Sequence, residues 1–348
     1  MLVQLQYTRA IAALLVVYFH AVLQIERLGF ESDLRQYLFG ETGVDLFFVL
    51  SGFVMWLTTA GRQIGPLEFY RKRIERIVPL YWLLTLAAAG IALVMPSYLN
   101  STRFDLPHLI ASLFFIPWTN AADEAGQLIA PVVIPGWTLN FEMYFYLIFG
   151  ALLLLAERVR IAALTLVLFV LFLLFNLVPG DSVAARFYGN SIVFEFLAGV
   201  VLARLYMAGK LLPEPAAKIL LPVAGAGLIL FDALDTGIPR IFSAGVPAFL
   251  IVFCLVSIDF SKLREVTWLR LVGDASYSLY LTHVFTLVAV RIAYGKLSVD
   301  WIENEFVFIS ICLVASVMVS LVTYRLFEAP IARWLKGVHR RERAVVRT

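Results

Sequence analysis

The chain has 348 residues, of which 61% are hydrophobic and 15% are charged, and its formal net charge is +3. Soluble proteins average about 45–50% apolar and about 25% charged residues, so this composition excludes a water-soluble globular domain. The two cysteines lie in apolar segments and the four histidines have no close ligand spacing, which argues against a disulfide framework or a metal site. We expect an integral membrane protein that holds no metal or tightly bound cofactor and binds no nucleic acid.

Apolar runs long enough to cross a bilayer, which takes about 17–25 residues, recur along the whole chain. We predict an all-α fold of about ten transmembrane helices in one bundle. The predicted spans are residues 10–28, 43–60, 77–95, 137–156, 161–178, 190–207, 219–234, 241–258, 272–292 and 305–325. The segment "HLIASLFFIPW", residues 108–118, is too short to span, so we predict a re-entrant or interfacial piece there.

The distribution of Lys and Arg predicts the orientation of these spans. With the N-terminus inside, 21 of the 28 Lys and Arg residues fall on the inner side. The positive-inside rule then places both termini in the cytoplasm. We divide the chain into a membrane domain, residues 1–335, and a basic cytoplasmic tail, residues 336–348, whose charge suits the anionic inner leaflet.

The first span carries two ionisable residues, Arg9 and His20, in "YTRAIAALLVVYFHAVLQ". On a helix they share one stripe and lie about 16 Å apart along the axis. An ionisable side chain at mid-bilayer costs about 2.5–3.5 kcal/mol, so it normally faces a polar cavity and has a partner. We therefore predict a cavity beside His20. The alternative is a neutral histidine that is hydrogen-bonded between helices.

Later spans add polar residues at helical spacing. Asp45 opens the second span, where its carboxylate either faces the cavity or caps the helix. Glu142 lies in the outer part of the fourth span, with Thr138 at i−4 on the same face. The ninth span carries a polar stripe at i, i+4 and i+7, made by Ser276, Tyr280 and His283. A histidine beside carboxylates can act as a general base, but a proton-coupled transporter would show the same residues.

On the cytoplasmic side, "FYRKRIERIVPLYW", residues 69–82, places Lys72, Arg73 and Arg76 on one face of a short helix. Guanidinium groups bind phosphate oxygens in bidentate geometry, so this face suits a phosphorylated ligand. The alternative is an ordinary positive-inside segment in which Glu75 pairs with Arg71.

Seven stretches together resemble the membrane acyltransferase-3 family, in the order in which that family carries them. They are "LQYTRAIAALLVVYFH", "GVDLFFVLSGFVM", "FYRKRIERIVPLYW", "PGWTLNFEMYFY", "FEFLAGVVLARL", "VGDASYSLYLTH" and "FEAPIARWL". The resemblance covers roughly residues 4–335. It implies a ten-helix membrane bundle in the bacterial inner membrane, with cytoplasmic acetyl-CoA as co-substrate and an extracytoplasmic or lipid-linked carbohydrate as acceptor. No appended periplasmic domain is evident, so the chain resembles the stand-alone exopolysaccharide acetyltransferases.

The resemblance also implies roles for individual residues. Arg9 and His20 would belong to the catalytic or donor-binding core, and Arg73 and Arg76, with Lys72 beside them, would bind the coenzyme. Two carboxylates would lie near the acceptor, Glu142 and Asp45.

From these residues we expect His20 to act as general base on an acceptor hydroxyl, with His283 as the other candidate. Candidate donors to the oxyanion are Tyr280, Ser276 and His283. Ser51 could carry an acyl group, although a small-residue helix contact is the favoured interpretation. Trp137 and Tyr144 could stack on sugar rings, whereas Tyr146 fits an interfacial aromatic belt better. The rival function is a secondary transporter for a sugar or a proton; the oligomeric state stays open.

Overall fold

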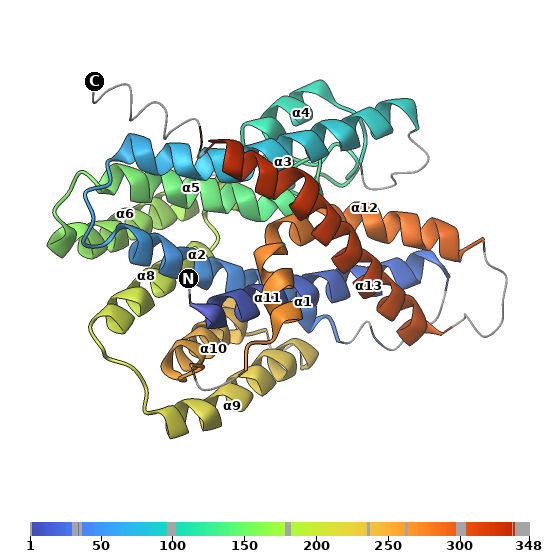
Figure 1. The fold of residues 1–348 in the computed structure, drawn as a ribbon. Coiled ribbons are helices and arrows are strands. Elements are labelled where there is room, and N and C mark those ends of the chain that lie inside the picture. Colours follow the sequence, from blue (N-terminus) through green and yellow to red (C-terminus); the bar gives the residue numbers. More distant parts are fainter. Residues whose placement is uncertain are drawn as a thin grey trace.

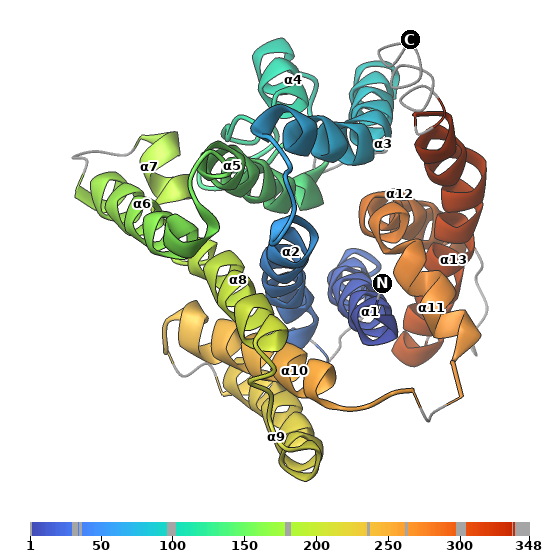
Figure 2. The same ribbon diagram turned by 60° about the vertical axis from the view of Figure 1, so that its left-hand side comes forward.

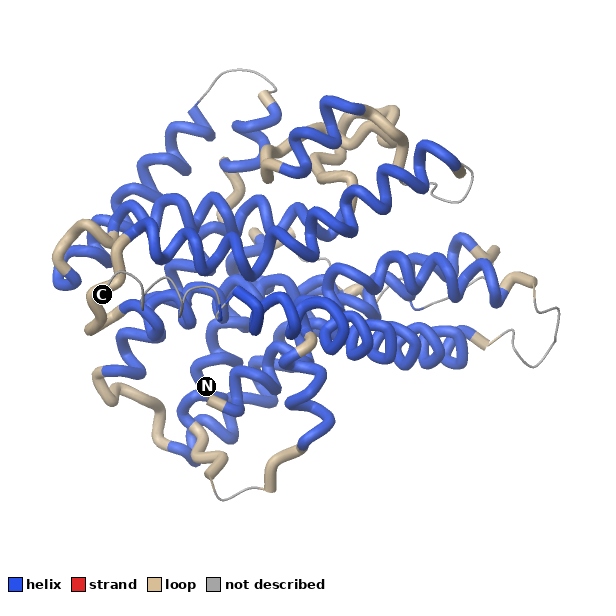
Figure 3. The backbone as a smooth tube through the Cα atoms, turned by 45° about the horizontal axis from the view of Figure 1, so that its top comes forward, coloured by secondary structure: helices blue, strands red, loops and turns tan. Residues whose placement is uncertain are grey.

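The computed structural model describes residues 2–29, 34, 37–95, 102–177, 182–234, 237–261, 264–296, 304–335 and 337. Within these ranges the chain is helical, with one isolated bridge between Thr119 and Ile129 and no longer strand (Figures 1 and 3). The predicted all-α class is therefore confirmed. The basic tail predicted at residues 336–348 lies outside the described residues, apart from residue 337.

The α-helices, in chain order, are α1 (Val3–Arg27), α2 (Gly43–Thr59), α3 (Pro66–Val94), α4 (Leu106–Leu113), α5 (Trp137–Leu152), α6 (Glu157–Leu177), α7 (Val183–Tyr188), α8 (Val193–Met207), α9 (Glu214–Ala233), α10 (Val246–Ser257), α11 (Thr267–Asp274), α12 (Ser276–Tyr294) and α13 (Glu305–Thr323). The 3-10 segments η2 (Phe39–Thr42) and η4 (Ile134–Gly136) lead into α2 and α5. The π-helical segments η5 (Ile241–Gly245) and η7 (Tyr324–Glu328) precede α10 and follow α13.

Every predicted span contains a helix. Eight helical segments in the described ranges are long and apolar enough to cross a membrane, and Ile241–Ser257 is a shorter apolar helix. The chain is thus a multi-pass membrane protein, while the number ten and the sidedness of the termini stay predictions. The segment predicted not to span forms only the short helix α4, whose first turn is capped by Asp105 through a 2.7 Å hydrogen bond from the backbone N–H of His108.

The peripheral helices present apolar side chains outward. On α6, Leu166 is 62% and Leu177 73% exposed, and on α9 Ile219 is 70% exposed. Apolar surface of this kind is rare on water-soluble proteins, and lipid is its natural solvent.

Helix α1 lies at the centre of the bundle (Figure 2), where it packs against α2, α10, α11, α12 and α13. Its buried positions include four small residues with no exposed surface: Ala10, Ala12, Ala13 and Ala21. Small side chains let helices approach closely in a membrane, where there is little hydrophobic force between them. The span that carries Arg9 and His20 can therefore lie inside the bundle, away from lipid.

Helices α2 and α8 meet backbone to backbone. A Cβ atom on Gly52 would lie 1.9 Å from the carbonyl oxygen of Phe196, and one on Gly199 would lie 2.0 Å from that of Val49. No larger side chain fits at either glycine without moving a helix. The closest small-residue contact of α2 is thus made by Gly52, next to Ser51.

Candidate functional site: two stacked cavities

Two cavities lie one beyond the other along the central helices. The arginine cavity, about 90 Å³, includes Arg9 and Arg76, and every described residue that lines it belongs to α1, α2, α3, α5 or α12. The histidine cavity, about 380 Å³, includes His20 and uses the same five helices together with η2 and the chain between α3 and α5. Val44 and Tyr280 line both. Each of the five helices therefore passes from one cavity to the other.

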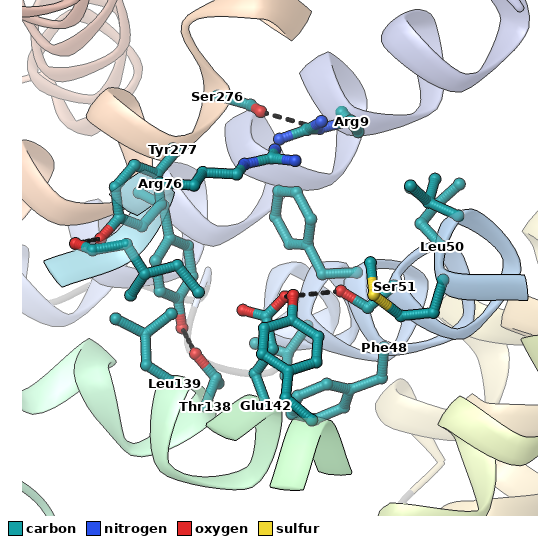
Figure 4. Close-up of a pocket in the computed structure, with 17 residues that line it drawn as sticks. Arg9, Phe48, Leu50, Ser51, Arg76, Thr138, Leu139, Glu142, Ser276 and Tyr277 are labelled. Carbon is teal, nitrogen blue, oxygen red and sulfur yellow. Dashed lines mark hydrogen bonds between the residues drawn. The ribbon is translucent and has the colours of Figure 1, made fainter. Parts of the chain in front are cut away.

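The arginine cavity holds two guanidinium groups side by side (Figure 4). Arg9 Nε donates a hydrogen bond of 3.2 Å to Ser276 Oγ, and Ser276 has no exposed surface. Arg76 extends into the same space from α3. Because the hydroxyl of Ser276 fixes the direction of Arg9, the cavity presents a preformed cationic site that suits an anionic ligand.

Glu142 faces these arginines across the cavity. Ser51 Oγ donates a 2.8 Å hydrogen bond to Glu142 Oε1 (Figure 4), and the Tyr146 hydroxyl donates to the same oxygen. Tyr146 is only 4% exposed, so its assignment to an aromatic belt is wrong. Glu142 thus lies with Arg9 and Arg76 and is not among the described residues of the histidine cavity, where its expected role near the acceptor would require it.

The three cations predicted on one face of α3 have three different surroundings. Arg76 lines the cavity, whereas Arg73 packs over the rings of Phe69 and Tyr146, at 5.3 and 5.7 Å from their centroids. Lys72 points to the surface and pairs with Glu68 at 2.8 Å. Side chains three and four residues apart share a helix face, but of the three cations only Arg76 is among the described residues that line the cavity, and Arg73 stacks on the aromatic rings beside it. The expected ion pair between Arg71 and Glu75 is present at 3.7 Å.

His20 lies on the wall of the histidine cavity, as the sequence predicts. Its Nδ1 lies 2.9 Å from the carbonyl oxygen of Val16. A carbonyl only accepts hydrogen bonds, so Nδ1 carries the proton and Nε2 keeps the free electron pair that a general base needs. Trp137 lines the same cavity and could stack on a sugar ring, and Gln24, Arg27 and Glu41 add hydrogen-bonding groups.

The structure separates the two candidate histidines. The ring of His283 lies 4.9 Å from that of His20, centroid to centroid, but has no exposed surface. Its Nδ1 donates to the carbonyl of Leu279 at 3.1 Å, and its Nε2 has no hydrogen-bond partner among the described residues. His283 is also absent from the described residues that line either cavity. Only His20 is placed to meet a substrate, with His283 directly behind it.

The hydroxyl of Tyr280 is already engaged. It donates to the carbonyl oxygen of Pro135 at 2.8 Å and lies 2.8 Å from Thr138 Oγ1. A group that stabilises an oxyanion must have a proton to donate, so Tyr280 fits that expected role only if it first releases Pro135.

Asp45 is neither a helix cap nor a cavity residue. Its two oxygens accept hydrogen bonds from Nε and Nη2 of Arg240 at 3.1 and 2.8 Å, and Arg240 also pairs with Glu41. Asp45 has no exposed surface. The sequence analysis missed Arg240 because nothing in a single outer-loop arginine indicates a partner 195 positions away.

Tyr144 also lies away from both cavities. Its ring stacks on that of Tyr188 in α7, with centroids 4.5 Å apart. The structure gives no support to its expected contact with a sugar.

The chain between α3 and α5 forms the remaining wall of the histidine cavity, through Leu128 and residues 132–135. Asp123 holds this loop by accepting hydrogen bonds from the backbone N–H groups of Leu128 at 2.5 Å and Gln127 at 2.7 Å. These bonds, that of Leu128 foremost, lower the pKa of Asp123. Arg186 of α7 also stabilises the loop, because it donates a 2.7 Å hydrogen bond to the carbonyl of Gln127.

Comparisons with known proteins bear on this site. The profile of a family described as an acyltransferase domain, Acyl_transf_3, matches residues 2–325. The exopolysaccharide production protein ExoZ of Rhizobium meliloti (strain 1021) is 31% identical over 302 residues, which cover 86% of this chain and 92% of that protein.

Two O-acetyltransferases are similar at lower identity. O-acetyltransferase OatA of Staphylococcus aureus (strain NCTC 8325 / PS 47) is 25% identical over 328 residues, covering 84% of this chain and 53% of OatA. Peptidoglycan O-acetyltransferase OatA of Listeria monocytogenes serovar 1/2a (strain ATCC BAA-679 / EGD-e) is 28% identical over 313 residues, covering 79% and 47%. The chain thus spans about half the length of these two relatives. No solved structure matches it significantly.

Proposed function

This chain belongs to the acyltransferase family whose profile its residues 2–325 match, and from that premise we propose that it moves an acyl group, acetyl in the first place, from cytoplasmic acyl-CoA to a carbohydrate hydroxyl. The acceptor is a polysaccharide or lipid-linked sugar on the outer side of a bacterial inner membrane. The printed names of the relatives, exopolysaccharide production for ExoZ and O-acetyltransferase for OatA, support this class of acceptor. Family membership favours this function over a proton-coupled transporter.

The observation that carries the proposal is the pair of cavities on the same five helices. One presents guanidinium groups and the other presents the free Nε2 of a histidine, and they meet at Val44 and Tyr280. A transferase with donor and acceptor on opposite sides of a membrane needs two such chambers that share a wall.

Arg9 and Arg76 are the proposed donor-binding residues. Coenzyme A carries phosphates that bind guanidinium groups, and a long pantetheine arm that can extend from them along a helix bundle. The Lys and Arg bias of the sequence supports a cytoplasmic position for this cavity. Arg73 supports the site indirectly through its packing on Tyr146, which donates to Glu142.

His20 is the proposed general base. Its Nε2 takes the proton of the acceptor hydroxyl while the hydroxyl oxygen forms a bond to the thioester carbonyl carbon. The carbon–sulfur bond then breaks, and the CoA sulfur takes the proton back from His20. We favour this direct route over an acyl-enzyme on Ser51, because Ser51 lines the arginine cavity, and the acceptor would occupy the histidine cavity beyond Tyr280.

The test is transfer of labelled acetyl from acetyl-CoA in membrane vesicles that contain the cell's own surface polysaccharide. The variants are His20→Ala and, as matched control, His108→Gln, since His108 is a buried histidine that hydrogen-bonds to the carbonyl of Ala130 at 2.9 Å, outside both cavities. Loss of a general base lowers the rate by about 10²–10⁴-fold.

We expect His20→Ala to lose transfer at unchanged membrane abundance, and His108→Gln to keep it. Full transfer by His20→Ala would remove the proposed base, and wild-type vesicles whose polysaccharide gains no label from acetyl-CoA would remove the proposed donor.

A further inference from the structure

Tyr280 stands between the two cavities. It is one of two residues, with Val44, that line both of them among the described residues. Its ring lies 5.8 Å from that of Phe47, which lines the arginine cavity, and 6.0 Å from that of His283, which lies behind His20. The ring of Tyr280 therefore lies where the two cavities adjoin.

Two hydrogen bonds of its hydroxyl group hold the ring of Tyr280 between the cavities. The partners are Pro135, in the wall of the histidine cavity, and Thr138, in the wall of the arginine cavity (Figure 4, at Thr138). Tyr280 thus joins α12 to the start of α5 exactly where the cavities meet. The two bonds are neutral, one to a backbone carbonyl and one to a side-chain hydroxyl, so the ring can turn aside when they break.

We propose that Tyr280 is a movable barrier that keeps the donor thioester apart from the histidine cavity until transfer. The inference rests on the proposed acyl-CoA donor. With the ring closed, a thioester in the arginine cavity is shielded from water that enters with the acceptor. With the ring turned, the thioester carbon reaches the acceptor oxygen beside His20. Tyr280 is in this sense a positioning residue: it decides when the two substrates meet.

The structure offers a matched control on α3, outside both cavities. Tyr81 has no exposed surface and donates its hydroxyl to the carbonyl of Ser112 at 3.1 Å. It is absent from the described lining of either cavity. Tyr81→Phe therefore removes a comparable buried hydrogen bond without opening the barrier.

The first measurement needs no substrate. A cysteine is placed in the arginine cavity as Ser51→Cys, in a chain whose buried Cys254 and Cys312 are replaced by alanine. A membrane-impermeant charged methanethiosulfonate is added to right-side-out and to inside-out vesicles. We expect Ser51→Cys to react from one side only, and to react from both sides once Tyr280→Ala is added. Reaction from both sides before that change, or from one side after it, would overturn the barrier.

The second measurement follows release of CoA thiol from acetyl-CoA without acceptor. Here water attacks the thioester carbon, the carbon–sulfur bond breaks, and acetate and the CoA thiol are formed. We expect Tyr280→Phe and Tyr280→Ala to raise this hydrolysis about tenfold over wild type and Tyr81→Phe to leave it unchanged, since an open site loses its protection from side reactions. CoA release at the same measurable rate in all four proteins would overturn the inference. Labelling from both sides only after Tyr280→Ala, with no CoA release in any protein, would instead retain the barrier and reject acyl-CoA as donor.

Discussion

The two cavities differ in what builds them. Every described residue that lines the arginine cavity lies on one of five packed helices, whereas the histidine cavity takes part of its wall from the loop between α3 and α5. Helix walls fix side chains through many contacts, while loops allow variation in shape on a rigid scaffold. The contrast fits a donor that is always the same coenzyme and an acceptor that differs from one surface polysaccharide to another.

The largest difference between the two cavities is expected when a cation is removed from the arginine cavity. We expect Arg76→Ala to raise the KM for acetyl-CoA about ten- to a hundredfold, because hydrogen bonds to charged groups contribute about 1.5–3 kcal/mol. Lys72→Ala is the matched control from the same helix, since Lys72 is paired with Glu68 at the surface. The measurement is the KM for acetyl-CoA of both variants in vesicles. Equal KM values for the two variants would show that the arginine cavity does not bind the donor.

The next effect concerns the residue behind His20. A protonated His20 gains a hydrogen-bond acceptor if the unpartnered Nε2 of His283 turns toward it, so we expect His283→Leu to lower kcat about tenfold with little change in either KM. If His283 has only a structural role, leucine, which fills a similar volume, should replace it without loss of kcat. Wild-type kcat with a normal pH profile in His283→Leu would assign His283 to packing alone.

A smaller effect is expected at the loop wall. Arg186 fastens this loop through the carbonyl of Gln127, and it is exposed. Loss of one such bond is worth about 1 kcal/mol, so we expect Arg186→Ala to raise the acceptor KM about fivefold and to leave the donor KM unchanged. A change in the donor KM would mean that the loop also shapes the arginine cavity.

The smallest effect lies inside the loop, at Asp123. Because backbone N–H groups lower the pKa of this carboxyl, its contribution to folding is complete at neutral pH and is lost only as the pH falls through that lowered pKa. Asp123→Asn should therefore change acceptor binding slightly at pH 7 and shift the acid limb of the activity profile little. A large loss near pH 6 in the wild type would have to come from another group.

How far the sequence predicts this protein depends on the kind of feature. The membrane class and the positions of the helices follow from apolar runs, because transfer of a segment into lipid depends on its own composition. The polar residues on those helices were also found, since an ionisable group in an apolar run is costly wherever it lies. His20, Arg9, Arg76 and Glu142 all line cavities.

Partners could not be predicted in the same way. Asp45 resembles a cap until Arg240, far along the chain, is seen to bind it, and Tyr146 resembles a belt residue until its hydroxyl is seen to donate to Glu142. Arg73 and Lys72 follow the same helical spacing as Arg76, yet only Arg76 lines the cavity. The direction of a side chain within its helix face depends on neighbours that no local pattern contains.

The sequence by itself therefore determined which residues must avoid lipid, and the tertiary structure decided which of them meet. The cost of moving an ionisable residue into lipid depends on that residue and its own segment, so it can be recognised from the local sequence. Pairing, stacking and the division of one polar seam into two cavities at Tyr280 depend on how separate helices pack, and these arise only when the bundle forms.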